Sequence, residues 1–260
     1  MSATAMEATS AASDVLRRYA LTIGDTSLIL AQRLGEWIGH APALEEDLAL
    51  ANIALDLLGQ ARYLLSHAAQ LQGGGTEDHL AFLRDPQDFL NLSLVEQPNG
   101  DFGQTIVRQF LIDAWQLELF ERLQQSSEPK LAELAAKAIK ETRYHFRFSS
   151  GWMVRLGDGT EESHRRVQTA LDALWRFTHE MFVASPVEQE AAALGIGPDP
   201  ASLAAGWASR VEEVLQEATL KRPADVAYSW HGKRGQHSEH LSRLLAEMQI
   251  MQRTYPGAQW

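Results

Sequence analysis

The sequence predicts an all-α protein with four long helices in two antiparallel hairpins and additional helices at its C-terminal end. Ala, Leu, Glu, Gln and Arg dominate the chain, and Val, Ile and Thr nowhere alternate with polar residues over the length of a strand. Glycine and proline clusters divide the chain into the two hairpins, and a long crossover from Gly73 to Phe102 joins them. Two hairpins with one long crossover is the connectivity of ferritin-like four-helix bundles. Helix count alone favours the alternative, a generic helical bundle.

The first hairpin is predicted from the breakers that surround two apolar, helix-forming segments. The segment Gly39–Pro42 separates a helix around residues 21–37 from a longer one around residues 44–71, which ends at Gly73-Gly74-Gly75. Residues 1–14 lack the basic and apolar regions of a signal peptide. We expect a disordered lead-in over residues 1–18, and one helical domain over residues 19–260.

The second hairpin is predicted from residues 103 to 155, with a turn near Ser126–Pro129. Ile106, Phe110 and Leu117 lie on one face of its first helix at helical spacing. Gly157-Asp158-Gly159 ends the second helix of this hairpin. Further helices are predicted around residues 161–182, 202–220 and 237–253.

The composition excludes several classes of protein. The 260 residues contain no cysteine, so a disulfide scaffold, a zinc-thiolate site, an iron–sulfur cluster and a thiol nucleophile are all excluded. A net charge of −11 argues against nucleic-acid binding, which needs a basic surface. The sequence contains no run of about 18 apolar residues, the length that a membrane-spanning helix needs. We therefore expect a cytoplasmic protein that binds neither nucleic acid nor membrane.

Ionisable residues lie on faces that should be buried. Asp113 falls between apolar residues of its helix, and Glu141 and His145 continue the apolar stripe of the next. Counted from the turns, Asp25 should lie level with residue 57, whose nearest acid is Asp56. Asp113 should lie level with Glu141. A buried carboxylate is costly unless it is paired or coordinates a metal. The alternatives are water access at the edge of the bundle and, for Asp25, a helix N-cap at Gly24–Ser27.

Four acids at one level is the plan of a di-iron bundle, but two motifs that such a site needs are incomplete. Di-iron bundles carry Glu-x-x-His in the second helix of each hairpin. The corresponding positions here are Leu57 with Gln60, and Thr142 with His145. The sequence therefore predicts a decayed site with no bound metal, no cofactor and no catalytic residue. Its relic positions are Asp25, Asp56, Gln60, Asp113, Glu141 and His145.

Several segments of the chain carry a family pattern. They are Gly24-Asp25, Gln32–Trp37 (QRLGEW), His40–Pro42, Asn52–Arg62 (NIALDLLGQAR), Leu94–Gly100 (LVEQPNG), Lys137–Glu141 with Tyr144-His145, Leu245–Gln249 and Gln259-Trp260. Together they resemble the C subunits of bacterial phenylacetyl-CoA epoxidases, from about Tyr19 to the end of the sequence.

The resemblance implies a structural subunit with a ferritin-like fold. Such a subunit is a paralogue of the catalytic A subunit, pairs tightly with it, and belongs to a complex whose other subunits and separate reductase complete the enzyme. The A subunit holds two irons, and the complex adds one oxygen atom to the aromatic ring of phenylacetyl-CoA in aerobic phenylacetate degradation. The resemblance therefore implies that this chain is not catalytic by itself.

Two other functions remain open at this stage. One is an independent metal-binding enzyme with an irregular ligand set, and the other is a helical interaction protein unrelated to oxygenases. The crossover is long for a connector. Its segment Asp88, Phe89, Leu90 and Asn91 is a candidate for proximity to the substrate or the partner subunit.

Overall fold

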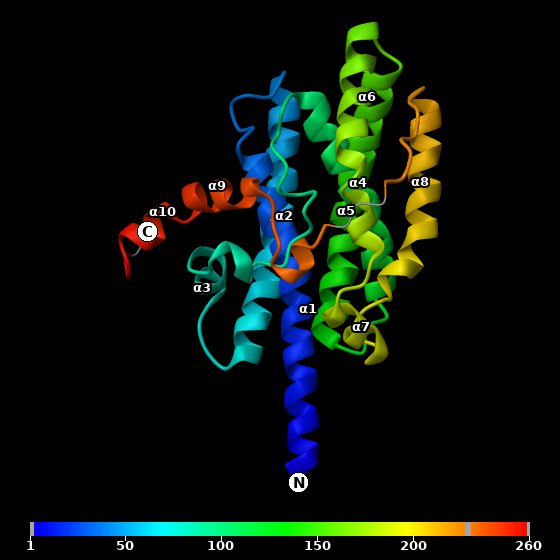
Figure 1. The fold of residues 1–260 in the computed structure, drawn as a ribbon. Coiled ribbons are helices and arrows are strands. Elements are labelled where there is room, and N and C mark those ends of the chain that lie inside the picture. The colour runs from blue at the N-terminus through cyan, green and yellow to red at the C-terminus, as the bar shows by residue number, and fades with distance from the viewer. Residues whose placement is uncertain (1–2, 227–229, 259–260) are drawn as a thin grey trace.

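The computed structural model describes residues 3–226 and 230–258 and contains two long helix hairpins side by side (Figure 1). Helix α1 (Ala3–Gly35) packs along α2 (Leu44–Gln72), and α4 (Phe102–Leu123) packs along α5 (Pro129–Gly157). The described residues contain no β-strand, only an isolated bridge between His231 and Gln236. The predicted ferritin-like, all-α fold is confirmed.

Helix α1 begins much earlier than predicted. Residues 3–18 are helical, so the predicted disorder over residues 1–18 is wrong for this stretch, while residues 1–2 lie outside the described part. Val15, Leu16 and Tyr19 are buried in the core, and this packing extends the helix toward the N-terminus. Asp25 lies inside α1, so it is not an N-cap residue.

Shorter helices pack against the two hairpins. Helix α6 (Glu161–Trp175) and helix α8 (Ala204–Glu217) pack against α4 and α5. The single helix predicted over residues 161–182 is divided, because α6 ends at Trp175 and a 3₁₀ helix, η2 (Thr178–Phe182), follows. Helix α7 (Pro186–Ala193), which was not predicted, packs against α1. A 3₁₀ turn, η3 (Pro200–Leu203), leads into α8.

The crossover between the hairpins is a packed part of the core. It contains α3 (Glu77–Phe82) and a 3₁₀ turn, η1 (Pro86–Asp88), neither of which was predicted. The side chains of Phe89 and Asn91 are fully buried, Leu90 is nearly so, and Asp88 is exposed. Only Asp88 of the candidate loop is therefore open to direct contact with a partner or substrate.

The C-terminal segment, residues 230–258, returns across the first hairpin (Figure 1). It contains the 3₁₀ turn η4 (Gly232–Arg234), α9 (Glu239–Met248) and α10 (Ile250–Thr254). The one helix predicted over residues 237–253 is thus divided near Gln249. The side chain of Gln249 is buried and donates hydrogen bonds to the carbonyl oxygens of Ala81 and Arg84 in the crossover.

Helix α2 is unusually apolar for a helix at the surface of a bundle. Among the described helices it alone has the length and hydropathy to cross a membrane, although half of its most apolar 18-residue window is buried inside the structure. The sequence prediction found no span because it required an uninterrupted apolar run. Partly buried core helices pass the same length and hydropathy test, so this is weak evidence for a membrane span. Exposed leucines on the outer side of α2 contribute to its hydropathy.

Candidate functional site

The residues that lie opposite each other in each hairpin are not those predicted by counting equal distances from the turn. Ser27 contacts Gln60, and Asp113 contacts Ser149 instead of Glu141. Helical side chains point toward the N-terminus of their own helix, which is away from the turn on the first helix and toward it on the second. The partner of a residue on the first helix therefore lies further along the second helix than the count predicts.

The carboxylate of Asp25 is paired with a cation of the chain itself. Its side chain is fully buried and forms a salt bridge with both terminal nitrogens of Arg84 from the crossover. The backbone N–H of Leu90 donates a further hydrogen bond to Asp25 Oδ2 at 2.9 Å. The Arg84 guanidinium also stacks over the ring of Phe89, 4.1 Å from its centroid. Asp25 is thus a structural anchor of the crossover.

Two polar pairs connect α2 with α5. His145 Nε2 lies 3.0 Å from Asp56 Oδ2, and Gln60 Nε2 donates to Glu141 Oε2 at 3.3 Å. His145 and Gln60 are buried, whereas the side chains of Asp56 and Glu141 keep 38% and 21% of their exposure. These two carboxylates therefore lie at the edge of the bundle with access to water. This was one of the alternatives that the sequence left open for the acids on the helix faces.

Asp113 is the most deeply buried acid of the second hairpin. Its oxygens accept hydrogen bonds from Gln109 Nε2 and Ser149 Oγ, both at 2.7 Å. Burial raises the pKa of Asp113 to about 6, against the opposing effects of the nearby His145 and of these two hydrogen bonds. A raised folded-state pKa means that ionisation of Asp113 lowers stability as the pH rises through that value.

We expect Asp113→Asn to gain stability relative to the wild type as the pH rises from 4 to 8. The wild-type carboxyl ionises at an energetic cost over this interval, and the amide does not. The difference in the free energy of unfolding should grow by about 3 kcal/mol at most. Urea titrations at several pH values measure it, with the exposed Asp172→Asn as the control. A pH-independent difference would show that Asp113 keeps an ordinary pKa.

The donor set does not fit a di-iron centre. No group of three or more His, Asp or Glu side chains among the described residues is arranged to hold a metal ion. The carboxylate of Asp25 is occupied by Arg84, and each remaining acid has its own protein partners. Buried atoms without partners include both donors and acceptors, His145 Nδ1, Thr142 Oγ1 and the amide of Gln116. A metal site would need acceptors alone.

Another buried carboxylate, Glu96, was not predicted from the sequence. It accepts hydrogen bonds from Asn91 Nδ2, His237 Nδ1 and both the N–H and Oγ of Ser238. The other ring nitrogen of His237 lies 2.8 Å from the carbonyl oxygen of Phe89. Because both ring nitrogens face acceptors, His237 is protonated when this arrangement is complete. Glu96 therefore fixes the C-terminal segment to the crossover.

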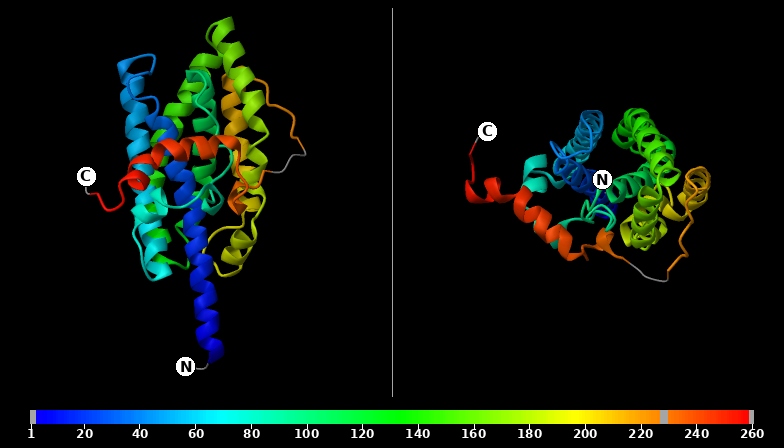
Figure 2. Two further views of the ribbon diagram at one scale, coloured as in Figure 1. Left: turned by 60° about the vertical axis from the view of Figure 1, so that its left-hand side comes forward. Right: turned by 90° about the horizontal axis from the view of Figure 1, so that it is seen from above.

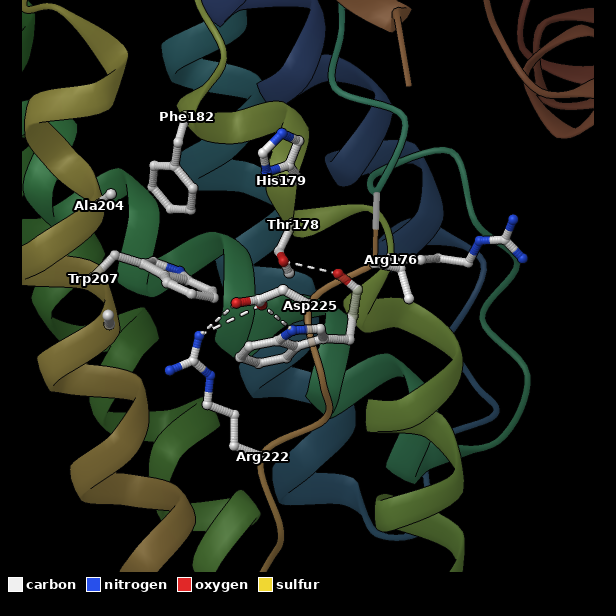
Figure 3. A pocket seen from close by; sticks show the side chains of 11 residues that line it. Arg176, Thr178, His179, Phe182, Ala204, Trp207, Arg222 and Asp225 are labelled. Atoms are coloured by element: carbon white, nitrogen blue, oxygen red, sulfur yellow. Dashed lines mark hydrogen bonds and ion pairs between the residues drawn. The ribbon is translucent and has the colours of Figure 1, made fainter. Parts of the chain in front are cut away.

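A pocket of about 290 Å³ lies between α6, η2 and α8 (Figure 3). Trp207 and Phe182 line it, and Arg222 extends toward Asp225. Asp225 also accepts a hydrogen bond of 2.9 Å from the indole nitrogen of Trp175, over whose ring the Arg222 guanidinium lies. The charged groups Arg222 and Asp225 are thus paired with each other. Among the pocket's described residues, no group of three or more His, Asp or Glu side chains is arranged to hold a metal ion.

Comparison with known proteins decides the family. The family described as phenylacetic acid catabolic protein matches residues 1–260. The chain belongs to this family. It is also similar to the C subunit of 1,2-phenylacetyl-CoA epoxidase from Escherichia coli (strain K12), with 56% identity over 245 residues. The match covers 94% of this chain and 99% of the relative. The family resemblance predicted from the sequence motifs is confirmed, and phenylacetic acid catabolic proteins are ferritin-like, as the bundle is.

Proposed function

We propose that this chain is a non-catalytic structural subunit of a phenylacetyl-CoA epoxidase complex. In this complex it pairs with the di-iron A subunit and acts with the other subunits and a separate reductase, in the cytoplasm. The observation that carries the proposal is the salt bridge between Asp25 and Arg84. A carboxylate that a di-iron bundle needs as a ligand is here bound by a cation of the chain itself.

The remaining relic positions support the same proposal. Gln60 stands where a di-iron bundle has a histidine, and its amide bonds to Glu141 and Ser27. Leu57 and Thr142 stand where it has glutamates, and both are fully buried. The relic residues therefore contribute hydrogen bonds and packing. No observation favours an independent metal enzyme, and membership of an oxygenase-related family argues against an unrelated interaction protein.

The purified chain, loaded aerobically with Fe(II), should retain well under one iron per chain. The physical reason is that one imidazole and two glutamates are missing and that Asp25 is neutralised by Arg84. Metal analysis after gel filtration measures the iron content. Two equivalents of iron, accompanied by a di-ferric absorption band, would instead identify a working metal enzyme.

Turnover by the reconstituted complex should be insensitive to the relic residues. Asp113→Asn and His145→Gln remove no contact to a transition state, so we expect turnover within about threefold of the wild type at matched yields of complex. The assay measures epoxidation of phenylacetyl-CoA by the assembled enzyme. A hundredfold loss with His145→Gln in an intact complex would mean that this subunit takes part in the chemistry.

A further inference from the structure

One group of exposed large apolar side chains lies at the start of α2. Of the twelve among the described residues, four lie on the turn after α1 and on the outer side of α2. Ile38 is 59% exposed, and Leu44, Leu48 and Leu55 are 69%, 55% and 64% exposed. The three leucines are four and seven residues apart, so they form one stripe along the helix. Exposed apolar side chains that share one side of a helix are typical of a binding surface.

A basic stripe runs along the outer side of α5. Lys137, Lys140, Arg143 and Arg147 are exposed, in a chain whose net charge is −11. Lys137 lies 3.7 Å from Glu141, and Arg147 lies over the ring of Tyr144. Lys140 and Arg143 form no ion pair with any residue that the structure describes. These cations are therefore available to a partner.

The two stripes lie on helices that pack against each other, and we call the surface that they form together the open face. Asp56 and His145 join α2 to α5, and the residues that precede them in the sequence, Leu55 and Tyr144, are exposed. In the view from above, α3 and α9 lie beyond the first hairpin and α6 and α8 beyond the second (Figure 2). No other described helix lies over the side where α2 and α5 meet (Figure 2).

We propose that the open face binds the catalytic subunit of the complex. This inference rests on the proposed function and specifies which surface performs it. The catalytic subunit would place apolar side chains against α2 and carboxylates against α5, because only that arrangement buries the leucines and neutralises the cations together. Apolar centres flanked by complementary charge are typical of specific protein interfaces.

A second copy of this chain does not fit the open face. A symmetric pair would place α5 either on the second copy's α5, with basic residues facing basic residues, or on its α2, with basic residues facing leucines. Neither arrangement neutralises the cations. Asp56 and Glu141 lie partly exposed between the stripes and reduce the attraction of this surface to an anionic membrane.

The test compares variants of the two stripes with matched variants elsewhere. One variant is Leu48→Glu with Leu55→Glu, and the other is Lys140→Glu with Arg143→Glu. The controls are Ile250→Glu, at a site 58% exposed, and the exposed Arg122→Glu, both outside the open face. All substituted side chains are exposed, so thermal unfolding should be unchanged. Affinity for the purified catalytic subunit should fall at least about tenfold in both open-face variants and remain unchanged in the controls.

Hydrogen exchange in the wild-type complex should show new protection over residues 44–59 and 137–147. If the wild-type chain does not bind the catalytic subunit, the proposed function itself fails. If the wild type binds and the open-face variants bind equally well, the function stands and the assignment of the surface is wrong. Binding to anionic phospholipid vesicles that Lys140→Glu with Arg143→Glu abolishes, while subunit binding persists, would assign the surface to a membrane.

Discussion

Arg84→Ala should destabilise the bundle by about 3–5 kcal/mol, the cost of leaving a buried charge without its partner. Asp25 is fully buried, and the Arg84 side chain keeps only 10% of its exposure. The substitution also removes the guanidinium from the ring of Phe89 and a hydrogen bond to the carbonyl oxygen of Asp88. Urea unfolding followed by circular dichroism measures the loss of stability.

Two further variants separate the buried charge from other effects of this substitution. Arg62→Ala removes the exposed ion pair with Glu77 and should change stability by no more than about 0.5 kcal/mol. Adding Asp25→Asn to Arg84→Ala removes the unpaired carboxylate and should recover part of the loss. A loss below about 1 kcal/mol from Arg84→Ala alone would show that water replaces the guanidinium at Asp25.

Glu96→Gln should release the C-terminal segment and lower the free energy of unfolding by about 2–4 kcal/mol. The reason is that an amide has one acceptor oxygen for the donors that bond to two carboxylate oxygens in the wild type. Asn91, His237 and Ser238 together direct four donors at the two oxygens of Glu96. Limited proteolysis should therefore cleave residues 230–258 faster in the variant than in the wild type. Glu239→Gln, in an exposed pair with Arg243, is the matched control and should leave the rate unchanged.

The same contact makes the segment sensitive to pH. Burial opposes the charge of His237, but the hydrogen bond and charge of Glu96, with the Phe89 carbonyl and Glu180, outweigh it and raise the pKa of His237. Its contribution to stability is complete below the ordinary histidine pKa of about 6.5 and is lost as the pH rises through the raised value. Proteolysis of the segment should accelerate over that interval in the wild type. A flat pH profile would mean that His237 is neutral throughout.

The four long helices could be predicted from the sequence because their boundaries are marked locally. The Gly73-Gly74-Gly75 run and the Ser126–Pro129 turn lie within a few residues of the observed helix ends. The start of α1 could not be predicted, since residues 3–18 have no local apolar pattern as clear as that of later helices. Their helical state depends on burial of Val15 and Leu16 against distant parts of the chain.

The candidate site was predictable only in part. Helical spacing correctly predicted that Asp113 and His145 are buried, because that property depends on one helix alone. The partners of Asp25 and Glu96 could not be predicted. Arg84 is 59 residues from Asp25, and His237 is 141 residues from Glu96, with irregular segments between them. Such segments have no periodicity from which a tertiary contact can be inferred.

The Arg84 guanidinium has a thermodynamic consequence for the assembly of the complex. A metal ion stabilises a fold according to its free concentration, and a chelator reverses that effect. A cation that is covalently part of the chain has no such mass-action dependence, so Asp25 is neutralised at any level of cellular iron. We expect the unfolding midpoint of this chain to be unchanged by EDTA. Under the proposed function, the chain would then be folded before any iron is delivered to the catalytic subunit.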